Sequence, residues 1–147
     1  MLDKKYIGHK LTGFSAEANA ERLRFFAKAI GQQDPIYTDI SVAQEAGYPT
    51  LPLPPTFLFC LEMSAPNPAE VRDLLGIDWG KVLHGGQSFV YHQMAFAGDR
   101  LSFQGQIADI YDKKGGALDF VVIDTRVTNQ NGALVADLRK TTVVRNT

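Results

Sequence analysis

The chain has 147 residues, which fits a single domain over residues 1–147 that can bury a hydrophobic core without disulfide or metal staples. Hydrophobic residues make up 45% and charged residues 21%, and a formal net charge of -1 without runs of like charge excludes a nucleic-acid-binding surface. The start of the chain has no apolar signal region and the longest apolar run is broken by prolines, so we expect a cytoplasmic protein that does not enter a membrane.

The first half of the chain is predicted to form helices and loops. Ser15 is a suitable N-cap for a helix with apolar positions 23, 26, 27 and 30, and Gly31 should end that helix. Ser41 is expected to cap a second, short helix over Val42–Ala46, which Gly47 ends.

A proline-rich segment over residues 49–55 leads into a third helix. Proline removes backbone donors and keeps the chain extended, so this segment cannot be regular structure. Pro55 suits the first position of a helix over Thr56–Met63, which is apolar nearly all round and should therefore be buried. Cys60, the only cysteine, lies within this helix and is expected to be an inert packing residue.

The second half of the chain is predicted to form four long strands, because β-branched and aromatic residues dominate and turn residues separate the segments. The segments are Val82–Met94, Arg100–Tyr111, Leu118–Thr128 and Leu134–Arg145. Asn131-Gly132 is a strong hairpin signal between the last two segments. Antiparallel strands that follow one apolar helix predict an α+β fold, with a curved antiparallel sheet of at least five strands wrapped around that helix.

Five segments of the chain, in this order, resemble the MaoC-like dehydratases, in particular the FAS1-like N-terminal type found in two-domain or two-subunit acyl dehydratases. The segments are Phe26–Gly31, Asp34–Asp39, Pro54–Phe57, Leu83–His92 and Ala97–Leu101. The resemblance implies a hot-dog fold and kinship with R-specific enoyl-CoA hydratases and 3-hydroxyacyl dehydratases. It also implies an acyl-CoA or acyl-carrier-protein thioester as the substrate, to which water is added, or from which it is removed, across the α,β double bond.

The resemblance also shows where this chain departs from its family. Catalytic members carry an Asp and a His on either side of an Asn-Pro turn, and Gln32 and Tyr37 stand at those two positions here. A glutamine cannot act as a base, and a tyrosine with a pKa of about 10 is a poor base at neutral pH. The N-terminal type of domain often lacks the pair, which a partner domain or subunit then carries.

His84 and Asp34 are the catalytic candidates if the chain turns over alone. Asp34 has a structural alternative, since an Asp before Pro commonly forms a turn by bonding backbone amides two residues on. His84 precedes Gly85, where the backbone can approach a ligand closely, and its alternative is a hydrogen-bonded structural histidine. Even spacing leaves open whether His92 shares its face, because the glycines can bulge the strand.

The start of the central helix is the expected binding place for the thioester carbonyl, because the resemblance implies that amides there point at it. Proline has no N–H, so Thr56 and Phe57 are the better donors at this helix start. The alternative is a rigid start to a buried helix with no ligand. The expected substrate-binding residues are Gln32, Tyr37, Thr56, Phe57 and Gly85, in a cleft shared with Asp34 and His84.

Three functions remain open from the sequence. The first is an acyl-thioester hydratase or dehydratase, active as a homodimer or higher oligomer or as a heterodimer with a motif-bearing hot-dog subunit. The second is a non-catalytic acyl-binding partner of such a subunit, and the third is a hot-dog acyl-CoA thioesterase, which needs a carboxylate to activate water. No cofactor or metal is expected, because no ligand residues have suitable spacing.

Overall fold

The computed structural model of the chain describes residues 1–146. Its helices and strands, in chain order, are η1 Lys4–Tyr6, β1 Phe14–Glu17, α1 Ala20–Ala29, η2 Pro35–Tyr37, α2 Ile40–Glu45, α3 Phe57–Glu62, α4 Glu70–Leu75, η3 Trp79–Lys81, β2 Val82–Tyr91, β3 Arg100–Lys113, β4 Leu118–Thr128 and β5 Leu134–Arg145, where η marks a 3-10 helix.

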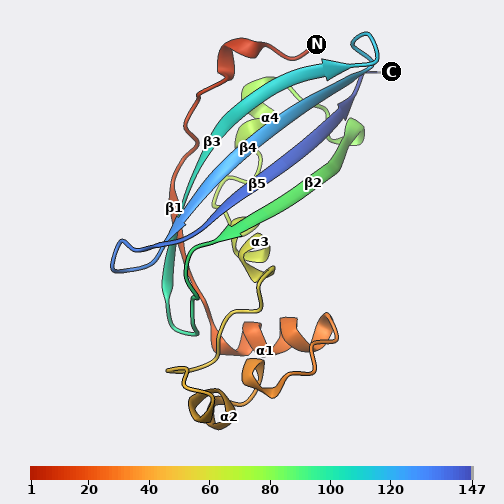
Figure 1. The fold of residues 1–147 in the computed structure, drawn as a ribbon. Coiled ribbons are helices and arrows are strands. Elements are labelled where there is room, and N and C mark those ends of the chain that lie inside the picture. The colour runs from red at the N-terminus through yellow and green to blue at the C-terminus, as the bar shows by residue number, and fades with distance from the viewer. Residues whose placement is uncertain (147) are drawn as a thin grey trace.

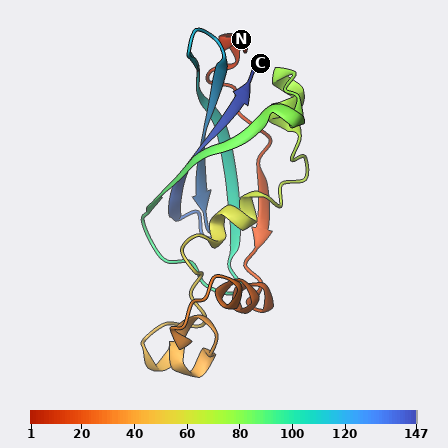
Figure 2. The same cartoon turned by 90° about the vertical axis from the view of Figure 1, so that its right-hand side faces the viewer.

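Five strands form one antiparallel sheet in the order β1-β3-β4-β5-β2, which confirms the predicted α+β class and strand count. The sheet curves, with α3 and α4 against one face and α1 and α2 beyond one end (Figures 1 and 2). We call the face that α3 covers the inner face. In residues 1–146, no helix covers the opposite, outer face.

Helix α3 forms the centre of the main hydrophobic core, as its apolar sequence predicts. Leu58 and Leu61 are buried and belong to one cluster with Leu101, Phe103 and Leu138 of the sheet. A second cluster holds residues of α4, β3, β4 and β5 farther along the inner face. Burial of a leucine side chain stabilises a fold by about 1.5–3 kcal/mol, so α3 is bound to the sheet chiefly by its apolar contacts.

The starts of the first two α-helices differ from the sequence prediction. Ser15 is not a cap but lies in β1, where it pairs with Ser102 of β3. The N-cap of α1 is Asn19, whose side chain accepts hydrogen bonds from two amides of the first turn. Asp39 caps α2 in the same way, so Ser41 is already inside that helix. In both cases an Asx side chain with extended backbone was the stronger cap.

Helix α3 is shorter than predicted. Thr56 occupies its N-cap position, and Pro55 lies before the helix rather than at its first position. Phe59 and Cys60 within the helix are only partly buried, and Met63, the C-cap, is 59% exposed, so the prediction that this helix is buried on all sides is wrong.

Two of the four predicted strands have the expected ends, and two do not. β4 and β5 agree with the prediction, whereas β2 ends at Tyr91 and β3 continues to Lys113. The predicted hairpin between β4 and β5 is confirmed, with Gly132 at φ 75° and the Asn129 side chain accepting from the amides of Asn131 and Ala133.

A β-bulge interrupts the pairing of β2 with β5 between His84 and Gly86. Gly85 is the extra residue, and a Cβ placed on it would lie 2.6 Å from Val143 Cγ2 and 3.2 Å from the Thr141 carbonyl oxygen. Only a glycine fits this approach of β2 to β5, which explains the residue type at position 85.

We expect Gly85→Ala to lower the free energy of unfolding by about 1–3 kcal/mol, because the added methyl group forces β5 to shift. Gly86→Ala is the matched control. The nearest atom to its added Cβ is Thr141 Cβ at 4.0 Å, so this change should be neutral or slightly stabilising. Urea denaturation of both variants measures the difference, and equal losses would contradict the assigned contact.

Candidate functional site

The turn before α2 uses its polar side chains to hold its own backbone. Asp34 Oδ1 accepts a hydrogen bond from the Ile36 amide at 3.1 Å, which confirms the turn-forming role considered for this residue. Gln32 Oε1 accepts from the Asp34 amide at 3.1 Å. Both side chains therefore stabilise the frame of the turn, and neither contacts Tyr37 through a hydrogen bond in the described chain.

A hollow of about 290 Å³ lies between η2, the start of α3 and the end of β2. Tyr37, Leu58 and Tyr91 are among its lining residues. Burial raises the pKa of Tyr37, and the charge of Asp34 and the neighbouring Tyr48 raise it further. Burial likewise raises the pKa of Tyr91, whose hydroxyl donates to the Pro55 carbonyl. At neutral pH both phenols are therefore protonated and can donate hydrogen bonds, but neither can act as a base.

The two amides expected to face a thioester carbonyl differ in the structure. The Phe57 N–H donates to the Pro54 carbonyl at 2.9 Å, so a turn already uses it, and the Phe57 side chain is buried in the core. Thr56 is exposed at the N-cap of α3, and its side chain does not cap the helix. Of the two, the Thr56 amide is the better placed for a ligand.

His84 lies apart from these residues, in a second hollow of about 340 Å³ between the inner face of the sheet, α3, α4 and η3. Its ring meets the Phe59 ring edge-on, with 5.5 Å between centroids, and its backbone pairs with Thr142. Tyr37 lines the first hollow and His84 the second, and the two hollows share no lining residue. Within one chain the described residues thus form two places rather than the single cleft expected.

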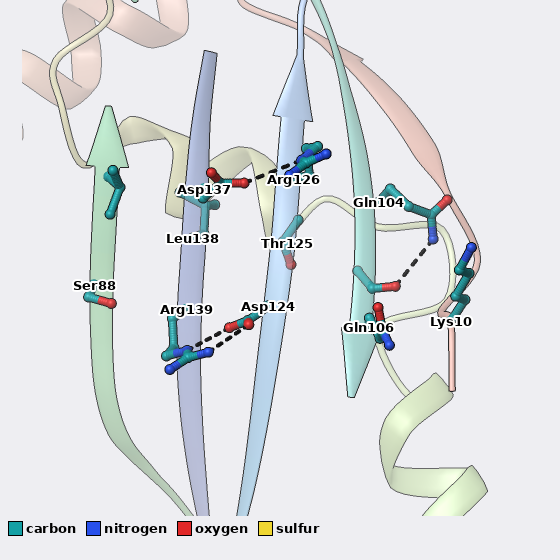
Figure 3. Close-up of a pocket in the computed structure, with 12 residues that line it drawn as sticks. Lys10, Ser88, Gln104, Gln106, Asp124, Thr125, Arg126, Asp137, Leu138 and Arg139 are labelled. Atoms are coloured by element: carbon teal, nitrogen blue, oxygen red, sulfur yellow. Dashed lines mark hydrogen bonds and ion pairs between the residues drawn. The ribbon is translucent and has the colours of Figure 1, made fainter. Parts of the chain in front are cut away.

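Neither Gly85 nor His92 lines the hollow that contains His84. Gly85 faces Val143 and Thr141 and makes room for the bulge. His92 Nε2 lies 2.9 Å from Asp137 Oδ2, and Asp137 belongs to the outer face (Figure 3). The bulge therefore separates the two histidines, in spite of their even spacing.

A third hollow, of about 660 Å³, lies over the outer face (Figure 3). The Arg139 guanidinium donates to both oxygens of Asp124, at 2.6 and 2.7 Å, and this bond raises the pKa of Arg139. Arg126 Nε lies 3.5 Å from Asp137 Oδ1. These four charged side chains pair with one another, whereas Lys10, which also lines the outer hollow, is in no ion pair among the described residues.

The structure shows one polar residue that sequence reasoning missed. Glu62, in α3, lines the 340 Å³ hollow with a side chain only 8% exposed. Its Oε1 accepts from the Thr125 hydroxyl at 2.6 Å, and its Oε2 lies 3.7 Å from Lys140 Nζ. A single carboxylate in a helix that is otherwise apolar and expected to be buried was the signal that could have identified it.

Residues 1–146 hold no group of His, Cys, Asp and Glu side chains able to bind a metal ion. None of the helices described is long and apolar enough to cross a membrane.

Known proteins are similar in sequence to this chain over most of its length. A UPF0336 protein of Saccharopolyspora erythraea is 35% identical over 147 residues, covering 99% of this chain and 93% of that protein. A UPF0336 protein of Streptomyces avermitilis is 34% identical over 126 residues, covering 85% of this chain and 81% of that protein.

Solved structures show the same fold. One is a chain of the C-terminally truncated HadBC (3R-hydroxyacyl-ACP dehydratase) complex from Mycobacterium tuberculosis, with a TM-score of 0.78, 26% identity, and coverage of 94% of this chain and 96% of that chain. Another, a MaoC-like dehydratase, has a TM-score of 0.84 at 23% identity, and this chain covers 42% of it. The family model described as FAS1-like, dehydratase domain region, matches residues 5–138. The chain thus has the hot-dog fold of the MaoC-like dehydratases and belongs to the FAS1-like dehydratase domain family.

Proposed function

We propose that this chain is the substrate-binding subunit of an acyl-thioester hydratase or dehydratase, whose substrate is carried on coenzyme A or acyl carrier protein. A second hot-dog subunit, with the family's Asp and His at its turn, supplies the acid and the base. The observation that carries the proposal is the turn at residues 32–37, which keeps the family's frame and lacks its chemistry.

The contacts of that turn support the proposal. Hydration needs a base that can take a proton from water at neutral pH. Gln32 has no such group, Asp34 is used in an Asx turn, and the raised pKa of Tyr37 keeps its hydroxyl protonated. This turn can position a substrate by hydrogen bonds, but neither Gln32 nor Tyr37, at the two positions of the family's acid–base pair, offers a base.

The exposed edge of the sheet supports a partner of the same fold. β2 is an edge strand of ten residues, and Val90, Tyr91 and Met94 in and after it are 57%, 45% and 45% exposed. Long edge strands with exposed apolar side chains favour pairing with another chain. The HadBC chain, which has a similar structure, is part of a 3R-hydroxyacyl-ACP dehydratase complex.

We expect the purified chain alone to hydrate crotonyl-CoA and longer enoyl-CoA esters at least about a hundredfold more slowly than its mixture with a motif-bearing hot-dog partner, the usual effect of an acid–base residue. Loss of absorbance of the conjugated thioester measures the rate. Calorimetry should show acyl-CoA binding to the chain alone, and failure to bind any acyl-CoA would rule out the thioester function.

Three outcomes separate the alternatives in the same assay. A full rate for the chain alone that falls about a hundredfold in His84→Ala or Asp34→Asn would assign catalysis to this chain. Wild-type rates in both variants would remove these residues from the mechanism. Release of free coenzyme A would instead indicate a thioesterase.

We expect the protein to be a dimer or larger, or to form a heterodimer with its partner, rather than to persist as a 16.2 kDa monomer at micromolar concentration. Light scattering measures the mass. Val90→Lys should weaken assembly by placing a charge on the β2 edge. Phe25→Lys is the control, since Phe25 is an equally apolar residue, 76% exposed, on α1. Dissociation by Phe25→Lys and not by Val90→Lys would move the interface from the edge to the helices.

A further inference from the structure

The carboxylate of Glu62 has one oxygen that no hydrogen bond satisfies. Oε1 accepts from Thr125 at 2.6 Å, but Oε2 is buried and accepts no hydrogen bond from residues 1–146. The nearest cation is the Lys140 ammonium at 3.7 Å, which is beyond hydrogen-bonding distance. Buried polar groups are almost always paired with protein, water or a ligand, so the unpaired carboxylate oxygen that lines this hollow requires a partner from outside the described residues, and a ligand group in the hollow can be that partner.

The hollow beside Glu62 is suited to an apolar chain. Aliphatic and aromatic side chains from α3, α4, η3 and the sheet form most of its wall, among them Phe59, Val71 and Ile123. A volume of about 340 Å³ lies within the range of small-molecule sites in proteins. The polar contacts at its floor are few, as expected where a small number of groups determines the orientation of a ligand.

The hollow has an exposed rim and a buried floor. Trp79 and Leu83 at its rim are 58% and 49% exposed, whereas Thr125 at its floor is 4% exposed and Glu62 is 9% exposed. A chain that enters from the rim therefore meets the carboxylate with its far end.

The ion pair of Glu62 and Lys140 contributes little to the stability of the fold by itself. A buried ion pair stabilises a fold only where its geometry is good and its remaining lone pairs are bonded, and a pair of apolar residues often does as well or better. Glu62 and Lys140 lie too far apart for a direct hydrogen bond. A hydroxyl group beside both atoms can donate to Glu62 Oε2 and accept from the Lys140 ammonium at once, because a hydroxyl is both donor and acceptor.

We infer that the hollow binds an acyl chain that carries a hydroxyl group near its far end, and that Glu62 and Lys140 recognise this hydroxyl. The inference rests on the proposed acyl-binding function and adds the class of acyl chain. The recognised hydroxyl is remote from the thioester, so it differs from the hydroxyl that dehydration removes.

The test compares three ligands with the same twelve-carbon acyl chain in calorimetry: dodecanoyl-CoA, its derivative with a terminal hydroxyl, and the methyl ether of that derivative. The wild-type protein should bind the hydroxylated ester about tenfold or more tightly than either of the others, as one hydrogen bond to a charged group provides. Equal affinities for the hydroxylated ester and its methyl ether would overturn the inference, because the ether has no O–H to donate to Glu62.

Two variants remove the recognition without leaving a lone buried charge. Glu62→Gln keeps the size of the side chain and the bond to Thr125 but loses the charge, so the tenfold preference should fall to about twofold or less. The double variant Glu62→Leu with Lys140→Met should lose the preference and remain as stable as the wild type or become more stable. Glu45→Gln, on the exposed surface of α2, is the control and should leave the preference unchanged.

A preference retained in both variants would overturn the inference, as would a double variant that is less stable and still discriminates. If Glu62→Gln, mixed with the catalytic partner, turned over every acyl-CoA more slowly but bound each with unchanged affinity, Glu62 would be assigned to catalysis. That result would also overturn the inference. Failure of all three CoA esters to bind would contradict the proposed function. The hollow is then tested by itself with dodecanol and dodecyl methyl ether. Tighter binding of the alcohol, lost in Glu62→Gln, supports recognition of the hydroxyl without the thioester.

Discussion

The packing of α3 against the inner face of the sheet determines where the other elements lie. α3 has six residues and is roughly 9 Å long, whereas β3 has fourteen residues and extends about 48 Å. One short helix cannot cover such a sheet, so α4 and Ile77 after it pack against another part of the inner face and form a second apolar cluster with the sheet. The 340 Å³ hollow lies at the junction of the two clusters, and Glu62, near the end of α3, lies at its floor.

The bulge at Gly85 has a consequence for both ends of β2. His84 pairs with Thr142 before the bulge, and Gln87 pairs with Lys140 after it. Residues paired across antiparallel strands point to the same face, and Thr142 and Lys140 both line the inner hollow, so His84 and Gln87 both face inward. Without the extra residue, the odd spacing of positions 84 and 87 would place them on opposite faces. The side-chain amide of Gln87 is buried and finds no hydrogen-bond partner among the described residues, so Gln87 is, after Glu62, a second side chain at the inner face with an unpaired polar group.

Local patterns in the sequence were sufficient for the elements whose structure is local. β4 and β5 have the predicted ends because alternation and turn residues mark both sides of each strand. β1 was missed, because four residues that pair with β3 across some ninety positions leave no local signal, and Ser15 was assigned to a cap instead. The polar group of Glu62, Thr125 and Lys140 was harder to predict from the sequence than the strands. Thr125 and Lys140 meet Glu62 only because three separate elements converge, whereas the spacing of Gln32, Asp34 and Tyr37 was visible directly in the chain.

The turn and the inner hollow together suggest how two subunits of one fold divide the work in the proposed complex. At the turn, Gln32 and Tyr37 stand where the family's acid–base pair would be, and the side chains of Gln32 and Asp34 accept hydrogen bonds from amides of the turn itself. In the inner hollow the situation is reversed, since Glu62 keeps a buried oxygen unpaired at a cost to stability. Strain of this kind persists where a ligand relieves it, so in this chain the group reserved for a ligand lies beside the apolar hollow and not at the turn.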